Sequence, residues 1–540
     1  MGFARTCAVA LVGVEGVVVE VQADLVPGVA GFTLVGLADK SLSESRDRVR
    51  AAVINSSVDW PQKKLTVGLS PAAVPKCGSG FDLAIACAVL AAAERVDPRS
   101  VADLMMVGEL GLDGRIRPVR GVLPAVLTAA DAGYRRVVVP ECAAAEAALV
   151  PDVSVLGVHS LRQLVALLTD EPVPEEPADA EPGPDPGSSG PVGPGWGHPG
   201  AGGLFQAVRI DERPLDLAEV AGQRRARRAL EVAAAGRHHL FLKGAPGAGK
   251  TMLAERLPGL LPPLTRQESL EVTAVHSVGG ALPPGRPLID RAPYCAPHHS
   301  ASMPALVGGG SGLPRPGAVS LAHHGVLFLD EAAEMSGQVL DALRQPLECG
   351  HVVVARAAGT LRMPARVLLV LAANPCPCGR HGAPGGDCEC LPSTVRRYRA
   401  RLSGPLLDRV DLRVPVEPVS RAELVATGGA ESTAVVAARV LAARERAAAR
   451  YAGSPWSING EVPGHELRTR WTPSPGALVR AEQDLERGLL TARGLDRVLR
   501  VAWTVADLAG HARPTVEDVD AALELRTGVR RGAGVAGSLP

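Results

Sequence analysis

Residues 244–251, GAPGAGKT, limit the folds that this chain can adopt more than any other stretch of its sequence. They fit the pattern G-x-x-x-x-G-K-[ST], with the apolar run HLFLK before them and a helix-forming run after them. A glycine-rich loop between a strand and a helix wraps its backbone N–H groups around phosphate. The segment therefore predicts a nucleotide-binding loop on an α/β sheet; the alternative is a glycine-rich turn that binds nothing.

Each part of this loop has an expected role. Gly247 and Gly249 permit positive φ and close approach of the backbone to phosphate. Lys250 is expected to reach the β and γ phosphates, and the Thr251 hydroxyl to ligate Mg²⁺. We expect the nucleotide to contact the whole loop: Gly244, Ala245, Pro246, Gly247, Ala248, Gly249, Lys250 and Thr251.

Two later apolar runs end in polar residues. GVLFLDEAAEM places Asp330 and Glu331 after one strand, and LVLAAN places Asn374 after the next. Open α/β sheets bind ligands at this edge. We expect Asp330 to hold Mg²⁺, Glu331 to orient or deprotonate an attacking water, and Asn374 to contact the γ-phosphate or that water. The alternative for Asp330 and Glu331 is that they only end a strand at the protein surface. The alternative for Asn374 is that it is an ordinary turn residue.

The chain divides into regions of different pattern. Proline, glycine and acidic residues dominate 171–205 and predict a disordered linker. Before it, β-rich runs, alanine-rich helices and a hairpin turn at Asp113-Gly114 predict an α+β domain. After it, strands alternate with helices, and then only helical patterns remain. The expected units are 1–170, the linker 171–205, a sheet domain 206–425, a helical domain 426–528 and a flexible tail 529–540.

Composition limits the classes of partner. A formal net charge of +0 argues against a uniformly basic surface but leaves room for a local basic channel. No apolar stretch approaches the ~20 residues of a membrane span, and Glu15 interrupts the N-terminal apolar run, so we expect neither a membrane segment nor a secretory leader. The expected compartment is the cytoplasm, where the ten cysteines stay reduced.

Four cysteines lie close together in NPCPCGRHGAPGGDCEC: Cys376, Cys378, Cys388 and Cys390. Four thiolates on a short loop can surround Zn²⁺ as a tetrahedron and brace a segment that has little core of its own. The C-x-C spacing is tighter than that of most zinc sites, so reduced cysteines and a disulfide are the alternatives, and His381 is a substitute ligand.

Longer motifs carry a family resemblance. APHHSAS, GVLFLDEAAEM, LRQPLECG, AANPCPCG and SGPLLDRVDL, with VGLSPAAVPKCGSGFDLAIACAVLAA nearer the N-terminus, resemble the magnesium-chelatase-like YifB/ComM family of AAA+ ATPases. The fold that this resemblance implies is α/β and multidomain. It comprises an N-terminal α+β Lon-protease-like (S5 domain 2-like) domain, a central P-loop AAA+ parallel sheet and a C-terminal helical lid. Cys295 stands where the family leads us to expect arginine, and His324 where it leads us to expect asparagine.

The resemblance also implies an assembly and two further site residues. The nucleotide is then ATP, and the chain forms a homo-oligomeric ring, expected to be a hexamer. Arg409 in LLDRVDL matches the arginine finger that reaches the neighbouring subunit's γ-phosphate. Arg493 in LTARGLDRVLR matches the sensor that closes on bound nucleotide. A solvated ion pair is the alternative role of each arginine.

Four uses of the ATP energy compete: proteolysis, a chelatase-type role, protein remodelling and movement of DNA. Proteolysis needs a serine activated by lysine, but Gly80 stands near the nucleophile position, with Ser79 beside it, and Pro124 and Val126 stand where lysines are expected. We therefore expect a non-proteolytic front domain, whose protein partner the sequence does not identify. A magnesium-chelatase-type subunit is one alternative, although the resemblance suggests that such subunits lack the front domain. An ATP-driven protein remodeller is another.

The resemblance favours movement of DNA, as in branch migration, recombination or natural transformation. A translocating ring holds phosphates with cationic loops at its pore. The hairpin expected at 348–367, with His351, Arg356 and Arg362, is one candidate, and a sheet edge is its alternative role. The segment 276–310, with His298 and His299, is a second candidate. TVRRYRARLSG, with Tyr398 between its arginines, is a third, and it can equally serve a subunit interface.

Overall fold

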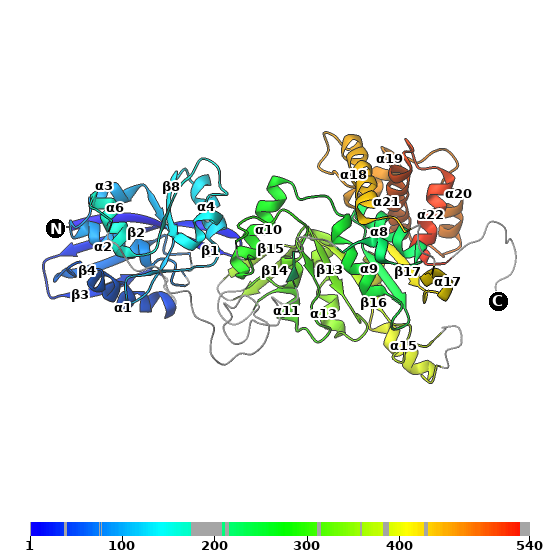
Figure 1. The fold of residues 1–540 in the computed structure, drawn as a ribbon, viewed down its shortest axis with the longest axis horizontal. Helices are drawn as coiled ribbons and strands as arrows, with labels where there is room; N and C mark the ends of the chain where they lie inside the picture. Colours follow the sequence, from blue (N-terminus) through cyan, green and yellow to red (C-terminus); the bar gives the residue numbers. More distant parts are fainter. Residues whose placement is uncertain are drawn as a thin grey trace.

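The computed structural model describes most of the chain (Figure 1). The described residues are 2–36, 40–74, 76, 78–173, 208–210, 215–283, 285–309, 315–356, 359–381, 388–425 and 430–529. Most of the linker and the tail predicted from the sequence therefore lie outside the described residues. No helix among these residues is long and apolar enough to cross a membrane.

The front domain is built on a seven-stranded mixed sheet of order β3-β4-β2-β1-β5-β8-β9. Its centre is the antiparallel pair β1 and β2, in which side chains alternate between core and solvent. A separate hairpin of β6 and β7 has Gly114 in its turn at φ 83°, which confirms the turn predicted at Asp113-Gly114. The strands are β1 (Gly2–Val12), β2 (Glu15–Val26), β3 (Gly31–Val35), β4 (Lys64–Ser70), β5 (Leu104–Met106), β6 (Glu109–Leu110), β7 (Ile116–Arg117), β8 (Arg136–Pro140) and β9 (Ser154–Val158).

The front-domain helices cover this sheet. The helix α2, DLAIACAVLAA, is buried along its whole length, because it packs on β1 and β2 with α1 and α3 beside it. The helices are α1 (Lys40–Asn55), α2 (Asp82–Ala92), α3 (Pro98–Ala102), α4 (Val122–Asp131), α5 (Ala144–Ala147) and α6 (Leu161–Thr169), with a 3₁₀ turn at Glu141–Ala143.

The second domain has a six-stranded sheet of order β10-β12-β13-β16-β11-β17, in which only β10 is antiparallel. The runs VLFL and LLVLAA of β13 and β16 are buried at every residue, as expected for central parallel strands covered on both faces. The sheet strands are β10 (Val208–Arg209), β11 (Leu240–Gly244), β12 (Tyr294–Cys295), β13 (Val326–Leu329), β16 (Leu368–Ala373) and β17 (Leu412–Val416).

The helices of this domain flank the sheet, and β14 (His351–Arg356) and β15 (Gly359–Pro364) form the predicted hairpin outside it. The helix α10 opens with a capping box between Thr265 and Glu268. The helices are α8 (Arg224–Gly236), α9 (Lys250–Arg256), α10 (Arg266–Gly279), α11 (Met303–Val307), α12 (Ala318–Leu321), α13 (Gly337–Asp341), α14 (Arg344–Cys349), α15 (Pro392–Ala400), α16 (Gly404–Arg409) and α17 (Arg421–Val425), with 3₁₀ turns at Leu217–Glu219 and Pro258–Leu260.

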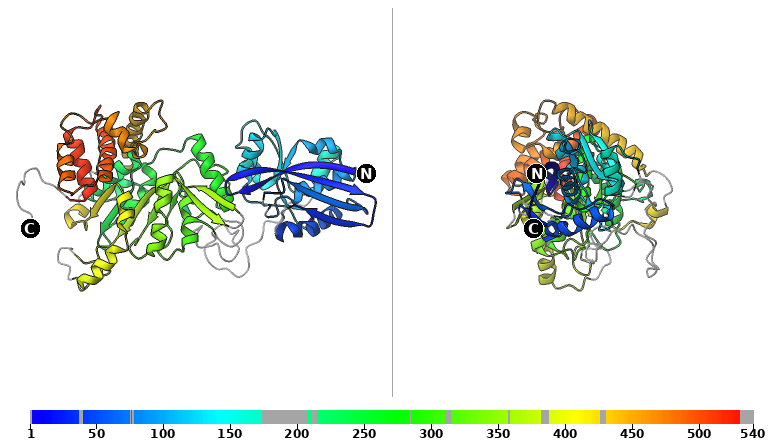
Figure 2. Two further views of the ribbon diagram at one scale, coloured as in Figure 1. Left: turned by 180° about the vertical axis from the view of Figure 1, so that it is seen from behind. Right: turned by 90° about the vertical axis from the view of Figure 1, so that its left-hand side faces the viewer.

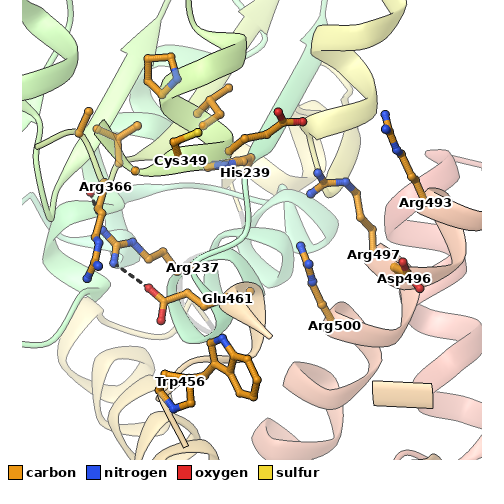
Figure 3. A pocket seen from close by; sticks show the side chains of 18 residues that line it. Arg237, His239, Cys349, Arg366, Trp456, Glu461, Arg493, Asp496, Arg497 and Arg500 are labelled. Atoms are coloured by element: carbon orange, nitrogen blue, oxygen red, sulfur yellow. Dashed lines mark hydrogen bonds and ion pairs between the residues drawn. The ribbon is translucent and has the colours of Figure 1, made fainter. Parts of the chain in front are cut away.

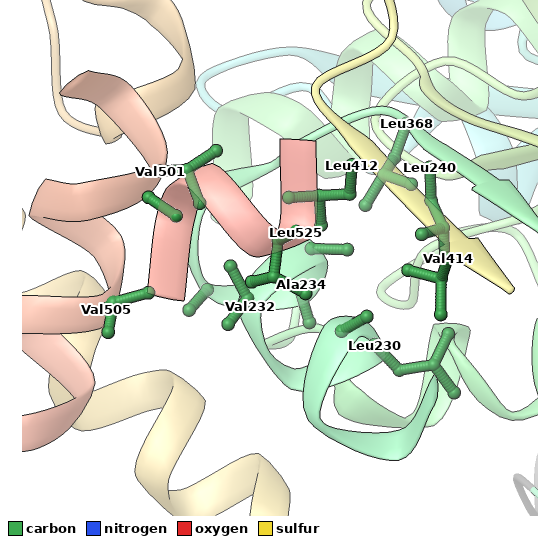
Figure 4. Packing of buried hydrophobic residues seen from close by; sticks show 14 of the residues in the cluster. Leu230, Val232, Ala234, Leu240, Leu368, Leu412, Val414, Val501, Val505 and Leu525 are labelled. Atoms are coloured by element: carbon green, nitrogen blue, oxygen red, sulfur yellow. The ribbon is translucent and has the colours of Figure 1, made fainter. Parts of the chain in front are cut away.

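A helical lid follows and shares a core with the sheet domain. Leu230 on α8, Leu412 on β17 and Val501 on α21 belong to one buried cluster (Figure 4). The capping box predicted at Thr515 and Asp518 is present at the start of the last helix. The lid helices are α18 (Thr433–Arg450), α19 (Gly464–Thr469), α20 (Val479–Glu486), α21 (Ala492–Ala509) and α22 (Val516–Thr527), with a 3₁₀ turn at Asn459–Glu461.

The front domain and the sheet domain lie end to end (Figure 2). The helix α10 packs on α4, and its Ser277 hydroxyl donates to Glu146 of α5. The β1–β2 turn lies against β15, where a Cβ on Gly13 would stand 2.4 Å from Leu361 Cδ1. The front domain therefore contacts both a helix of the sheet domain and its hairpin.

Candidate nucleotide site

The P-loop joins β11 to α9, as the sequence predicts. Gly247 and Gly249 have φ values of 75° and 92°, which the missing Cβ permits. The Lys250 ammonium donates to the Gly244 and Ala245 carbonyls, both at 2.9 Å, and to Asn374 Oδ1 at 3.0 Å. Burial lowers the pKa of Lys250, and Asp330 and Glu331 oppose that shift. The ammonium is thus held at the loop, next to the end of β16.

The two acidic residues follow β13 at the same sheet edge. The Thr251 hydroxyl donates to Asp330 Oδ2 at 2.7 Å, so both oxygens expected to ligate Mg²⁺ lie together. Asp330 Oδ1 accepts the backbone N–H of Glu331 at 2.8 Å. Glu331 has a φ of 48°, a left-handed conformation that is uncommon for a glutamate.

A cavity of about 370 Å³ opens between these residues. Its lining includes Pro246, Gly247, Gly249, Lys250, Thr251, Met252, Asp330, Glu331, Ala373 and Asn374. The structure therefore brings together the loop after β11, the two carboxylates after β13 and the amide after β16. Their oxygen ligands and ammonium suit a magnesium-bound triphosphate.

His299 also belongs to this site, although the sequence suggested a DNA-binding role for it. Its Nδ1 lies 3.0 Å from Glu331 Oε2, and its ring centroid is 4.0 Å from that of His298. His298 Nδ1 pairs with the Ser300 hydroxyl at 2.7 Å. No local pattern predicts the contact between His299 and Glu331, because 32 positions separate them; the histidine pair in APHHSAS was the only signal.

The two predicted arginines do not line this cavity within the described residues. Arg409 donates to the Glu348 carboxylate and to the Pro405 carbonyl. Glu348 and Arg493 line a second cavity of about 590 Å³ between the sheet domain and the lid. Arg493, Arg497 and Arg500 extend into this cavity from α21 (Figure 3). Both predicted arginines are thus associated with the lid-side cavity.

Two ion pairs, between Arg497 and Asp411 and between Arg526 and Asp408, join the Arg409 segment to the lid. Arg497 Nη1 donates to Asp411 Oδ1 at 2.6 Å, and Arg526 donates to Asp408 at 3.2 Å. Asp411 also accepts the His239 backbone N–H at 3.0 Å. Burial alone would raise the pKa of Asp411, but Arg497 and the nearby histidines hold that pKa well below its ordinary value. The position of Arg409 therefore depends on α21 and α22.

The segments proposed for DNA contact lie in different settings. On the β14–β15 hairpin, Leu361 is buried while Arg362 is exposed and lies 3.3 Å from His351 Nδ1. Nothing is described of the Arg356 side chain. In α15, Arg396 and Arg397 are exposed, but Tyr398 is only 4% exposed. The prediction that Tyr398 lies between basic residues on the surface is therefore wrong, because its ring packs into the core.

The four cysteines form one cluster, and all four are free thiols. Their Sγ atoms lie within 4.8 Å of one another. The disulfide alternative is thus not what the structure shows. The His381 ring is not part of the cluster; its backbone N–H donates to Cys376 Sγ at 3.3 Å.

The front domain does not pair a serine with a lysine at the positions considered. Ser79 donates to the Glu109 carboxylate, and the buried Lys76 donates to the Pro71 carbonyl.

The two departures from the family pattern have structural settings. Cys295 is fully buried on β12, and burial raises its pKa to about 12. His324 adopts a φ of 55°, a conformation that asparagine and histidine both tolerate. Its ring lies between Glu268 and Glu271, at 3.2 and 3.1 Å.

The fold and the site together define a class. A P-loop after β11, acidic residues after β13, an amide after β16 and a helical lid characterise the AAA+ P-loop ATPases.

Comparison with known proteins gives the family. Family models described as "Magnesium chelatase, subunit ChlI", "Subunit ChlI of Mg-chelatase" and "Magnesium chelatase, subunit ChlI C-terminal" match residues 216–424, 20–143 and 430–526. An uncharacterized protein of Mycobacterium tuberculosis is 51% identical over 98% of this chain and 100% of its own length. Competence protein ComM of Haemophilus influenzae is 39% identical over 96% and 97% of the two chains. YifB of Escherichia coli is 38% identical over 92% of each. The chain belongs to the magnesium-chelatase-like YifB/ComM family.

The comparisons also bear on the front domain. Lon protease of Roseiflexus castenholzii is 31% identical over 29% of this chain and 19% of its own length, in line with the Lon-like fold. The model matching 20–143 carries the name of a chelatase subunit.

Proposed function

We propose that this protein is an ATP-hydrolysing ring motor that acts on DNA. The cavity at the P-loop supports the ATPase part. Lys250 binds the β and γ phosphates, Thr251 and Asp330 hold Mg²⁺, Glu331 orients or deprotonates the attacking water, and Asn374 positions that water or the γ-phosphate. Bound Mg²⁺ supplies neutralisation of the charge that develops on the phosphates.

The placement of the arginines supports the ring. No arginine is among the residues that line the P-loop cavity in the described part of the chain, yet phosphoryl transfer gains about 10³ to 10⁵ in rate from such a charge. Arg409 and Arg493 lie on the lid side. We propose that Arg409 reaches the nucleotide of a neighbouring subunit and that Arg493 is the sensor that closes on bound nucleotide. Use in trans requires a closed assembly, for which a hexamer is our proposal.

Relatives and surface charge support the DNA substrate. One relative at 39% identity is named a competence protein, and competence concerns uptake of DNA. Arg362 on the hairpin, with Arg396 and Arg397 on α15, offers exposed cations for phosphates without base readout. We therefore propose branch migration or a related helicase-like activity in recombination or natural transformation.

The proposal has further parts. We propose Zn²⁺ at the four cysteines, since a tetrathiolate set is one that this ion favours. The functional units are 1–170, 206–425 and 426–528. The front domain binds a partner or organises the ring. The protein works in the cytoplasm.

One experiment tests both motor and ring. ATP hydrolysis is measured with and without forked DNA, for wild type, Lys250→Ala, Arg409→Ala and an equal mixture of the two variants. DNA should stimulate the wild type, each variant alone should be inactive, and the mixture should recover activity, because some interfaces then combine an intact P-loop with an intact finger. An inactive mixture of properly assembled rings would refute use in trans.

The alternatives are distinguished by their substrates. If neither forked nor single-stranded DNA stimulates hydrolysis or is retained at low salt, the DNA proposal fails. Stimulation by an unfolded polypeptide would then favour a protein remodeller. Stimulation by porphyrin together with a separate substrate-binding subunit would favour a chelatase-type role, which the family names keep in consideration.

A further inference from the structure

The cysteine cluster has the dimensions of a tetrahedral metal site. Cys376 Sγ lies 3.3 Å from Cys378 Sγ and 3.8 Å from Cys388 Sγ, and Cys378 and Cys388 are 3.7 Å apart. Zn–S bonds of about 2.3 Å at a tetrahedral ion separate the sulfurs by about 3.8 Å. A disulfide would bring two of them to about 2.05 Å. The separations therefore fit a shared ion.

The first pair of cysteines lies directly against the nucleotide loop. Cys376 follows Asn374 by two residues and is fully buried, and the Gly379 N–H closes a turn on the Cys376 carbonyl at 2.9 Å. Gly379 has a φ of 77°, and a Cβ there would stand 2.3 Å from Pro246 Cδ. The backbone of the turn 376–379 thus packs on the pyrrolidine ring of Pro246 in the P-loop.

The second pair of cysteines, Cys388 and Cys390, lies just before α15, and this helix and the residue after it contact the segments that follow β16 and β13. From α15, Arg399 Nε donates to the Pro375 carbonyl at 3.1 Å. Arg401 follows α15 and donates to the Ala333 carbonyl at 3.1 Å, close to the segment that carries Asp330 and Glu331. Residues around the cluster therefore contact all three strand ends of the nucleotide site.

We infer that this zinc site positions the ATPase machinery. The inference rests on the proposed Zn²⁺ at the four cysteines and on the proposed ATP hydrolysis. The ion joins the turn 376–379 to the start of α15 and so fixes the backbone on both sides of the cluster. The turn then holds Asn374 at the Lys250 ammonium and supports Pro246 from outside. The cysteines themselves touch no nucleotide; they act through Asn374 and the P-loop.

The first measurement is zinc itself. The full chain is purified without added metal, and its zinc is released and titrated with a chromogenic chelator. We expect about one Zn²⁺ per chain for wild type and for Cys142→Ser, a control at an exposed front-domain cysteine. The double variant Cys378→Ser/Cys388→Ser should contain none and should melt at a lower temperature. Equal, negligible zinc in all three proteins would refute the metal site.

The second measurement separates positioning from metal binding. Gly379→Ala keeps all four thiols but places a methyl group against Pro246. Gly453→Ala is a matched control, because Gly453 has a similar φ of 79° and open space around the position of a Cβ. We expect Gly379→Ala to retain its zinc and to lose kcat for ATP by about 10-fold. KM should change little, because most phosphate contacts remain.

The outcomes tell the proposals apart. If the wild type contains zinc but kcat is unchanged in both Gly379→Ala and the double cysteine variant, the positioning role is refuted and the metal site still stands. A wild type that binds ATP but does not hydrolyse it under any condition would instead overturn the proposed function. A fall in kcat for Gly379→Ala but not for Gly453→Ala, at equal zinc content, supports the inference.

Discussion

The buried Asp411 should be a strong link between the sheet domain and the lid. We propose to replace it by alanine. The change leaves the Arg497 guanidinium, 18% exposed, without its 2.6 Å partner, and removes an acceptor from the His239 N–H. Removing one partner of a buried pair costs about 3 kcal/mol or more. At about 2–4 °C per kcal/mol, the lid should melt about 6–12 °C lower.

The assay is tryptophan fluorescence during thermal unfolding, since Trp456, Trp471 and Trp503 all lie in the lid region. A control pair is available in the same lid: Arg480 and Asp520 are 3.0 Å apart but 39% and 34% exposed. Exposed pairs contribute about 0–1 kcal/mol, so Arg480→Ala should shift the transition by no more than about 4 °C.

The pH dependence gives an independent check of the same link. The pKa of Asp411 is depressed in the folded protein, so its contribution is full above the unfolded value of about 3.9 and is lost progressively as pH falls below that value and through the lower pKa of the folded state. The difference between wild type and Asp411→Ala should therefore be full at pH 7 and should shrink steadily as the pH is lowered below about 3.9. Equal shifts for Asp411→Ala and Arg480→Ala at pH 7, or a difference that does not shrink in acid, would refute the reasoning.

Three further predictions concern the nucleotide site. Lys250→Ala should lower ATP hydrolysis by about 100-fold or more, because the ammonium directed at the phosphates is lost; normal turnover in a steady-state assay would show that the site is assigned wrongly. Glu331→Gln should still bind a fluorescent ATP analogue but lose about 10² to 10⁴ in kcat, and equal losses of binding and turnover would argue against a role in water activation. His299→Ala should lower kcat by about 10-fold, because Glu331 loses the ring 3.0 Å from its carboxylate. His299→Gln, which keeps a donor, should recover part of that loss, and identical rates in the two variants would count against a positioning role.

Much of the nucleotide site could be predicted because its signals are local. A tight turn needs Gly247 and Gly249, and a buried parallel strand needs an uninterrupted apolar run such as that of β13. Neighbouring residues encode both requirements. Polar residues that follow such strands must then meet at one sheet edge, so the proximity of Asp330 and Asn374 to Lys250 follows from strand order alone.

Other features depended on packing between distant segments. The sequence placed Tyr398 on a basic surface, but the core of the sheet domain takes up its ring. It could not place Arg493 either, because the docking of α21 on the sheet domain decides which cavity that residue faces. The backbone near Arg493 is helical whichever way α21 docks, so no local sequence pattern shows which cavity Arg493 faces.

The sequence alone thus determined a glycine-rich loop between a strand and a helix and the acidic and amide residues that meet it at the sheet edge, because backbone conformation and burial leave a mark on adjacent residues. Only the tertiary structure brought His299 to Glu331, put the cysteine turn against Pro246 and fixed the Arg409 segment to the lid through Asp411. Those contacts join residues far apart in the chain, and the packing of whole helices and strands decides which of them meet.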